Sequence, residues 1–419
     1  MTQKTFPIPP ETVRQMEART PTPFHVYDAA GILRRAKALA GAFSWSPGFR
    51  NYFAVKATPN PAIRALLKKG AGSGADCSSM AELVLAERAG LRGEDVIFTS
   101  NDTPAEEFAA AARMGAILNL DDLEHVEFAR KALGGRLPEL MCARLNPGRA
   151  KEGNAIIGKP EEAKYGFTRE QLFDCYAKMK AAGVTRFGLH TMVASNELDP
   201  EYIIDTAKLL FTLAWEIHEK VGIDFEFVNI GGGIGIPYKP DQKAMSLERV
   251  GEGIRDAYAE LVEAKGMKPI RLYMECGRCI TGPYGYLVAK VRHIKNTYRL
   301  YAGLDACMSN LMRPALYGAY HEIVVPGKEN SAERKVYDVT GSLCENNDKF
   351  AIQRELPVLE PGDYVVICDA GAHGHAMGFQ YNGKLRSAEL LLEEDGSVRE
   401  IRRAETLADY FATLDFPGL

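Results

Sequence analysis

Eight short β-rich segments recur in the first two-thirds of the chain, and most are followed by a turn signal and a helical stretch. These segments are residues 51–55, 74–77, 96–100, 116–120, 140–145, 187–190, 225–230 and 271–275. Strands that alternate with helices indicate a parallel sheet, and eight strand–helix units are the number that closes a (β/α)8 barrel. We therefore predict an α/β fold built on a TIM barrel, with an open doubly wound sheet as the structural alternative.

Helical patterns fill the intervals between these segments. They are expected at residues 60–69, 80–89, 104–114, 123–133 and 169–182. Thr103 and Asp121 each stand three residues before a glutamate. This spacing is typical of a helix N-terminus that the side chain caps.

The pattern changes after about residue 280. Runs at residues 285–294, 317–325, 363–367 and 387–392 are separated by Gly, Pro and Asn, and a short helical pattern follows at 405–413. Such spacing is typical of antiparallel strands. We predict two domains, a (β/α)8 barrel at 26–278 and a C-terminal antiparallel β domain at 279–419.

Charge and hydropathy narrow the class of protein. The 419 residues carry 51 Lys and Arg against 55 Asp and Glu, a net charge of −4, so the basic excess of a nucleic-acid binder is absent. No apolar run reaches the ~20 residues that cross a bilayer, and the first ten residues lack the apolar core of a secretory signal. We expect a cytoplasmic protein with no nucleic-acid or membrane partner.

The eight cysteines are scattered through the chain, which favours free thiols in a reducing compartment over disulfides. Cys276 and Cys279 have CxxC spacing, but a zinc ribbon needs a second such pair. His373 and His375 are the only close histidine pair. We therefore predict no metal site.

TIM-barrel active sites lie at the carboxyl ends of the strands, and polar residues gather at these positions of the sequence. They are Lys56, Asp76, Asn101, Arg144, Asn146, His190, the glycines Gly231, Gly232 and Gly233, Glu275 and Arg278. Lys56 ends an apolar run, where desolvation is expected to lower its pKa and favour the free amine. A free amine can form a Schiff base with a carbonyl cofactor; the alternative is a surface lysine at a strand end.

Two further motifs suggest ligand binding. A glycine-rich turn after the seventh strand, Gly231 to Gly233, can surround a phosphate with backbone N–H groups, although an ordinary tight turn is the alternative. Glu275 can hold a ring nitrogen protonated and Arg278 can clamp a phosphate or carboxylate, or the two can form a simple ion pair. In the second domain, Cys344 beside Glu345 is a candidate proton donor, against the alternative of a buried apolar cysteine.

These residues resemble the motif series of the diaminopimelate decarboxylases, which belong to the alanine-racemase-like (fold type III) pyridoxal-phosphate enzymes. The motifs occur in order from about residue 24 to about 392. They are Tyr52-Phe-Ala-Val-Lys-Ala, Asn229-Ile-Gly-Gly-Gly, Glu275-Cys-Gly-Arg, Leu311-Met-Arg-Pro-Ala-Leu-Tyr317, Gly341-Ser-Leu-Cys-Glu-Asn-Asn-Asp348, and Asp369-Ala-Gly-Ala with Tyr381-Asn382.

The resemblance implies how pyridoxal 5'-phosphate is bound and where catalysis occurs. Lys56 would carry the cofactor covalently, Glu275 would pair with its pyridine nitrogen, and Cys344 would donate a proton. The other cofactor-binding residues implied are His190, Ser195, Gly231, Gly232, Gly233, Gly277, Arg278 and Tyr381.

The resemblance also implies the substrate residues and the assembly. The substrate-binding residues would be Arg278, Arg313, Tyr317, Glu345 and Tyr381. Cys344 and Glu345 would reach the partner subunit's barrel, so that a homodimer shares its active sites. The second domain would add a strand from the N-terminal residues 1–25.

One motif departs from the family. After the sixth strand the family has His-x-His-x-Gly-Ser, whose second histidine stacks on the cofactor ring. Here the stretch is His190-Thr-Met-Val-Ala-Ser195. Either Met192 covers the ring through its polarizable sulfur, or His190 reaches over it from two residues away on the same face of the strand. Cys276 also replaces the usual proline of the strand-eight motif.

We expect a carboxy-lyase that converts meso-2,6-diaminopimelate to L-lysine and CO2, the last step of lysine biosynthesis. The nearest alternative is a decarboxylase of the same architecture that acts on ornithine, arginine, carboxynorspermidine or a carrier-bound amino acid. A racemase is a second alternative, against which Glu275 argues, because related racemases place an arginine at the pyridine nitrogen. A non-catalytic cofactor carrier is a third, which the second domain disfavours.

Overall fold

The computed structural model describes residues 4–154, 156 and 158–415 and divides into two compact units. The barrel unit comprises residues 33–236 and 243–279, and the sheet unit comprises the chain up to Ile32, residues 237–242 and the chain from Ile280 onwards. The domain boundaries derived from the sequence, 26–278 and 279–419 with the segment 1–25, stay a prediction. Residues 1–3 of that segment lie outside the described residues.

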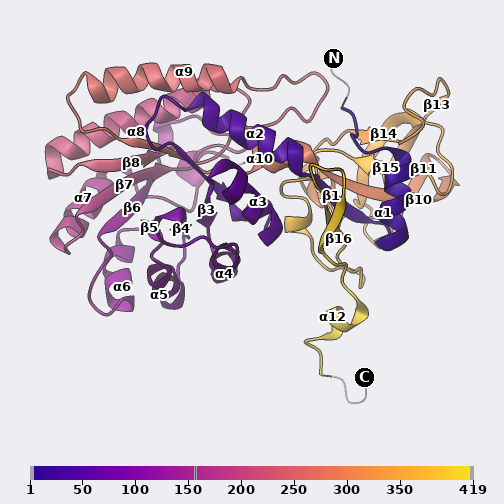
Figure 1. Cartoon of the computed structure of the whole chain (residues 1–419), viewed down its shortest axis with the longest axis horizontal. Helices are drawn as coiled ribbons and strands as arrows, with labels where there is room; N and C mark the ends of the chain where they lie inside the picture. Colours follow the sequence, from indigo (N-terminus) through magenta and orange to yellow (C-terminus); the bar gives the residue numbers. More distant parts are fainter. Residues whose placement is uncertain (1–3, 155, 157, 416–419) are drawn as a thin grey trace. The chain divides into compact units, whose positions relative to one another are not determined.

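The barrel unit is a closed ring of eight parallel strands, which confirms the predicted (β/α)8 fold (Figure 1). The strands are β2 (Arg50–Ala54), β3 (Gly74–Cys77), β4 (Val96–Thr99), β5 (Ile117–Leu120), β6 (Leu140–Leu145), β7 (Arg186–Thr191), β8 (Phe225–Asn229) and β9 (Arg271–Met274). The ring closes where Arg50 of β2 pairs with Tyr273 of β9. Because all eight strands run the same way, their carboxyl ends share one mouth.

Helices connect the barrel strands. They are α3 (Pro61–Ala71), α4 (Met80–Arg88), α5 (Ala105–Met114), α6 (Glu124–Ala132), α7 (Arg169–Ala181), α8 (Pro200–Val221) and α9 (Leu247–Tyr258), with α2 (Ala29–Ala42) before β2 and α10 (Arg278–Thr281) after β9. Within the described residues, no helix combines the length and the apolar character needed to span a membrane.

The two predicted side-chain caps are wrong. Neither α5 nor α6 begins with a side-chain cap. The hydroxyl of Thr103 instead donates to the carbonyl oxygen of Ser100, and Asp122, the neighbour of Asp121, accepts from the N–H of Glu124. A capping box forms at α7, where Thr168 and Gln171 cap each other reciprocally.

An aromatic and aliphatic layer fills part of the barrel interior. Its members are Tyr52, Ile97, Ile117, Leu140, Cys142, Phe227 and Tyr273. The rings of Phe227 and Tyr273 stack with their centroids 4.6 Å apart. Gly188 leaves room for this stack, because a Cβ atom there would lie 2.0 Å from the ring of Phe227. The interior is therefore packed, and chemistry is confined to the mouth.

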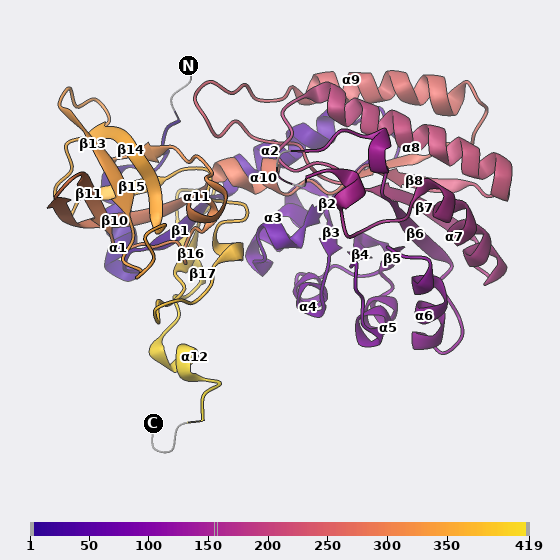
Figure 2. The ribbon, with the colours of Figure 1, turned by 180° about the vertical axis from the view of Figure 1, so that it is seen from behind.

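The sheet unit contains nine strands (Figure 2). They are β1 (Phe24–Asp28), β10 (Gly285–Asn296), β11 (Leu300–Leu304), β12 (Ile323–Val324), β13 (Arg334–Thr340), β14 (Lys349–Pro357), β15 (Tyr364–Ile367), β16 (Ala388–Leu392) and β17 (Val398–Arg402), and the helices of this unit are α1 (Pro10–Arg19), α11 (Arg313–Tyr317) and α12 (Leu407–Phe411). The sheet is mostly antiparallel but mixed, because β1 pairs with β16 and β11 pairs with β13 in parallel.

The run predicted as a strand at 317–325 is mostly not one. Pro314 fits the first turn of α11, and Gly318 ends this helix in the left-handed conformation, at φ 62°. Only Ile323–Val324 of the run pairs as a strand, with β15.

A buried charged network holds the N-terminal strand β1 in this sheet. Glu389 of β16 is 1% exposed. It accepts a hydrogen bond from the Tyr27 hydroxyl of β1 at 2.6 Å and pairs with Arg402 of β17. Burial alone raises the pKa of Glu389, but His375, Arg402 and Tyr27 outweigh it and lower this pKa to about 2. The carboxylate is therefore charged in the folded state over the whole neutral range.

We predict that Glu389→Gln destabilises the protein in a pH-dependent way. A folded-state pKa of about 2 against an ordinary value of 4.5 contributes about 3 kcal/mol of stability above pH ~5, which is lost as the pH falls toward 2. The free energy of unfolding in urea should therefore fall by a few kcal/mol at pH 7, and the difference from wild type should shrink on acidification. Glu393→Gln, at the surface pair with Arg399, is the control and should cost under about 1 kcal/mol.

Candidate active site

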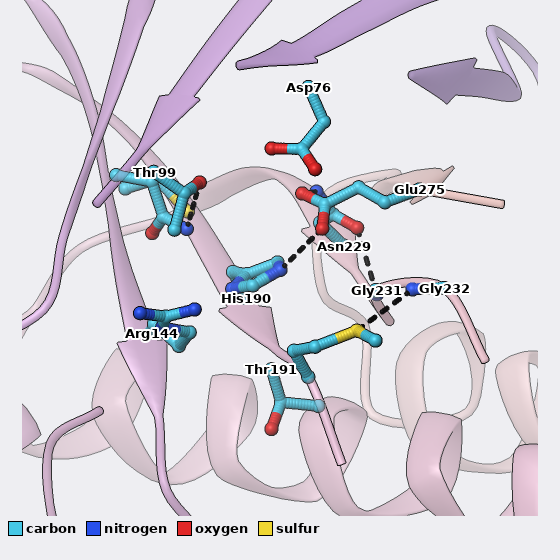
Figure 3. Close-up of polar contacts among 12 residues, drawn as sticks. Asp76, Thr99, Arg144, His190, Thr191, Asn229, Gly231, Gly232 and Glu275 are labelled. Atoms are coloured by element: carbon cyan, nitrogen blue, oxygen red, sulfur yellow. Dashed lines mark hydrogen bonds and ion pairs between the residues drawn. The ribbon is translucent and has the colours of Figure 1, made fainter. Parts of the chain in front are cut away.

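The mouth of the barrel gathers charged and polar side chains from five of its strands, and Figure 3 shows those of Asp76, His190, Asn229 and Glu275. Lys56 lies on a short turn directly after β2, and Asp76 lies on β3. His190 lies on β7, Asn229 ends β8 and Glu275 follows β9. The structure thus brings together residues that are up to 219 positions apart in the sequence (275 − 56).

Lys56 forms an ion pair with Asp76, whose Oδ2 lies 2.7 Å from Nζ. Burial disfavours the charged amine, but the charges of Asp76 and Glu275 and the hydrogen bond to Asp76 outweigh it, so the pKa of Lys56 is raised. The lowered pKa expected from the sequence is therefore wrong. The reason is electrostatic, because two carboxylates from distant strands face the ammonium group.

Glu275 is a buried carboxylate held by two donors. Its Oε2 lies 3.1 Å from Nε2 of His190, and its Oε1 accepts from Nδ2 of Asn229 at 2.8 Å. Burial raises the pKa of Glu275, but His190, Lys56 and Asn229 outweigh burial and lower it. An anionic group is thus fixed at the mouth.

The glycine turn after β8 has a conformation that requires glycine. Gly231 and Gly233 have φ values of 71° and 106°, a region that side chains rarely adopt. A Cβ atom at Gly232 would lie 2.7 Å from the carbonyl oxygen of Glu275. The turn therefore packs closely against the neighbouring strand ends, and a glycine backbone without side chains is the kind that can surround a phosphate.

Arg278 and Ser195 lie beside each other, and Arg278 Nη2 donates to Ser195 Oγ at 3.3 Å. Gly277 allows the chain after β9 to approach the Lys56 turn, because a Cβ atom there would lie 2.6 Å from the Cβ of Ala57. A guanidinium, a hydroxyl and the glycine turn together fit a phosphate, and Lys56 with the anionic Glu275 fits the carbonyl and the ring nitrogen of pyridoxal phosphate.

The two candidates for the ring-covering residue occupy different places. His190 is fully buried and is bonded to Glu275. Met192 lies on the glycine turn, where its sulfur accepts the N–H of Gly232 at 3.3 Å. His190 is thus engaged with Glu275, and Met192 is the neighbour of the candidate phosphate turn.

The sheet unit carries the predicted substrate residues. Arg313 is 5% exposed, donates to Nε2 of His321 at 2.9 Å and lies over the ring of Tyr238. His321 accepts at Nε2 because its Nδ1 donates to the carbonyl oxygen of Cys368. Tyr317, at the other end of α11, is exposed.

Cys344 is exposed and Glu345 is half-buried on the loop between β13 and β14. The N–H of Cys344 donates to Oδ1 of Asn382 at 2.7 Å, which places the loop beside the segment of the exposed Tyr381. Cys344 and Glu345 also line a hollow of about 540 Å³ in this unit. The structure therefore groups the cofactor candidates other than Tyr381 in the barrel unit, and it groups the substrate candidates other than Arg278 in the sheet unit.

All eight cysteines lie among the described residues, and each has a free thiol. In the described part of the chain, no group of three or more His, Cys, Asp or Glu side chains is arranged to hold a metal ion.

Sequence reasoning missed three partners of the site residues. Asn229 was visible as a polar strand end before the glycines, but its bond to Glu275 was not. His321 and Tyr238, which hold Arg313, carried no signal in the sequence. His321 lies eight residues after Arg313 but outside its motif, and Tyr238 comes from a distant segment of the chain.

The fold and the site define the class: a (β/α)8 barrel with a charged mouth, followed by a β-sheet unit. Residues 29–282 match the family of pyridoxal-dependent decarboxylases through its pyridoxal binding domain. The chain belongs to this family, and it is a pyridoxal-phosphate-dependent carboxy-lyase with diaminopimelate decarboxylases among its relatives.

Individual relatives span nearly the whole chain. Protein TabA of Pseudomonas amygdali pv. tabaci is 44% identical over 390 residues, which cover 93% of this chain and 90% of that protein. The diaminopimelate decarboxylase of Methanothermobacter thermautotrophicus is 32% identical over 404 residues, covering 95% and 92%. The crystal structure of diaminopimelate decarboxylase from M. jannaschii in co-complex with L-lysine superimposes with a TM-score of 0.90 at 28% identity, covering 97% of this chain and 94% of that chain.

We predict that Gly232→Ala weakens the binding of pyridoxal phosphate at least tenfold while the barrel stays folded. The added Cβ would meet the carbonyl oxygen of Glu275 at 2.7 Å, so the turn has to shift. Gly41→Ala in α2 is the matched control, because a Cβ there meets nothing within 4 Å. Fluorescence titration of both apoproteins measures the affinity, and equal affinities would contradict the role of the turn.

We predict that Asp76→Asn lowers the pKa of Lys56, because it removes the nearest negative charge. The attack of an amine on a carbonyl needs the unprotonated amine. The rate at which apoprotein takes up pyridoxal phosphate should therefore rise at a lower pH in the variant than in wild type. Stopped-flow absorbance at a series of pH values measures this midpoint. The exposed Asp122→Asn should leave it unchanged, and a midpoint that does not fall in Asp76→Asn would refute the assignment.

Proposed function

We propose that the protein decarboxylates meso-2,6-diaminopimelate to L-lysine and CO2, the last step of lysine biosynthesis. The observation that carries the choice of substrate is Arg313, a buried arginine fixed by His321 and by the ring of Tyr238. A fixed guanidinium suits a carboxylate, and diaminopimelate keeps a distal carboxylate after the other has left. Relatives named diaminopimelate decarboxylase support the proposal.

Pyridoxal phosphate, when bound, supplies the electron sink that decarboxylation needs. In the barrel unit, Lys56 would hold the cofactor covalently, at the position that the substrate amine would also take. Glu275 remains anionic and pairs with the pyridine nitrogen. The turn Gly231 to Gly233 binds the phosphate, with Ser195 and Arg278 beside it, and Gly277 keeps the approach to Lys56 open. His190 acts through Glu275.

The sheet unit recognises the substrate in this proposal. Arg313, with Tyr317, binds the distal carboxylate, to which Arg278 also contributes. Glu345 binds the distal ammonium by a charge-assisted hydrogen bond. Tyr381 contacts both substrate and cofactor.

Cys344 donates the proton that replaces the carboxylate, from its exposed place beside Glu345. We propose that Cys344 and Glu345 act in the partner subunit's barrel, in a homodimer with shared active sites. The exposure of Cys344 and the partial exposure of Glu345 on their loop are compatible with such a role.

A second candidate is decarboxylation of another basic or carrier-bound amino acid, such as ornithine, arginine or carboxynorspermidine. It is favoured by Met192 at the position where the family has a histidine, and by the 44% identity to a relative of a different name, Protein TabA. Glu275 is anionic and accepts hydrogen bonds from His190 and Asn229, and this disfavours an amino-acid racemase.

We predict that the purified protein with pyridoxal phosphate forms lysine from meso-diaminopimelate and that Lys56→Ala does not. Chromatographic detection of lysine and CO2 release measure the reaction, and ornithine, arginine and carboxynorspermidine are run beside it. Cys344→Ala should keep cofactor binding but lose at least tenfold in kcat. Turnover of one of the other substrates, with none of meso-diaminopimelate, would replace the first candidate by the second.

A further inference from the structure

His190 and Asn229 occupy neighbouring positions on adjacent strands. They are register partners in the pairing of β7 with β8, and both side chains reach Glu275. One carboxylate therefore receives a donor at each oxygen, from two strands that the barrel holds rigidly. Figure 3 shows the imidazole of His190 directed at Glu275, with Asp76 on the other side of that carboxylate.

The hydrogen bond defines which nitrogen of His190 carries the proton. A carboxylate only accepts, so Nε2 donates to Glu275. The other ring nitrogen, Nδ1, is buried and has no hydrogen-bond partner within the described residues. Leaving a buried polar atom unpaired costs stability, so stability alone does not account for a histidine at this place.

The burial of His190 and Glu275 also argues against a purely structural role for the pair. His190 is 0% exposed and Glu275 is 6% exposed. Burying a charged hydrogen-bonded pair rarely stabilises a fold more than apolar side chains of similar volume. The apolar layer that packs this barrel contains neither residue. The His190–Glu275 pair is therefore part of the candidate active site rather than of the hydrophobic core of the barrel.

We propose that His190 is a positioning residue that holds Glu275 ionised and oriented toward the pyridine nitrogen of pyridoxal phosphate. This inference rests on the proposed role of Glu275. The N–H of Nε2 stabilises the charged carboxylate, and a buried carboxylate that loses such a donor binds a proton more readily. A protonated Glu275 no longer favours the protonated ring, and the electron sink is weakened.

The test uses the absorption spectrum of the holoenzyme, which reports the state of the bound cofactor without any substrate. His190→Phe removes the donor, whereas His190→Gln keeps an N–H within reach of Glu275. His190→Phe should shift the absorption of the bound cofactor in the same direction as Glu275→Gln, and His190→Gln should resemble wild type. His125→Phe, a partly buried histidine on α6, is the control for loss of an imidazole and should leave the spectrum unchanged.

With whichever amino acid the enzyme decarboxylates, His190→Phe should lower kcat at least tenfold and change KM less than threefold. If His190→Phe does not fold, as judged by circular dichroism, His190→Ala replaces it with the same expectation. A spectral shift in Glu275→Gln but in neither His190→Phe nor His190→Ala overturns the inference and leaves the role of Glu275 intact. An unchanged spectrum in Glu275→Gln overturns both.

Discussion

Closure of eight parallel strands is the constraint on which the site depends. Parallel strands that form a closed ring deliver all their carboxyl ends to one mouth, so side chains from β2, β3, β7, β8 and β9 meet there without any local sequence relation. The register of β7 with β8 sets His190 beside Asn229, and both reach the carboxylate of Glu275. The packed layer of Tyr52, Phe227 and Tyr273 makes this frame rigid.

Electrostatics at the mouth follow from this frame. Asp76 and Glu275 face Lys56, and their charges keep its amine protonated against the cost of burial. Glu275 stays ionised because His190, Lys56 and Asn229 compensate its own burial. An amine that starts as an ammonium has to lose its proton before it can attack a carbonyl, and the paired Asp76 is the nearest carboxylate to receive that proton.

The barrel was predictable from the sequence because its signal is local and repeated: each of the eight β-rich segments matches a barrel strand. Strands β11, β13, β14 and β17 were not predicted. Polar and charged residues interrupt the apolar pattern of β13, β14 and β17, as in Arg334–Thr340, whereas β11 is apolar but short and contains Gly303. The residues of the candidate site were named from the motifs, and their roles stay predictions. The electrostatics of the site were not predictable, because the partners of Lys56 and Glu275 lie 20 and 85 positions away, and only the folded chain reveals such pairs.

Negative and positive side chains occupy different sides of the barrel mouth. The carboxylates Asp76 and Glu275 face Lys56, whereas the side with the glycine turn carries the guanidinium of Arg278, which donates to Ser195. A ligand that carries a cationic ring nitrogen at one end and a phosphate at the other matches this division, and its orientation is then fixed by charge as well as by shape. Met192 stands on the side of the glycine turn, with its sulfur on the N–H of Gly232. A thioether sulfur is a weak acceptor and is easier to displace from that N–H than a charged acceptor, so Met192 is compatible with the phosphate site proposed at the glycine turn.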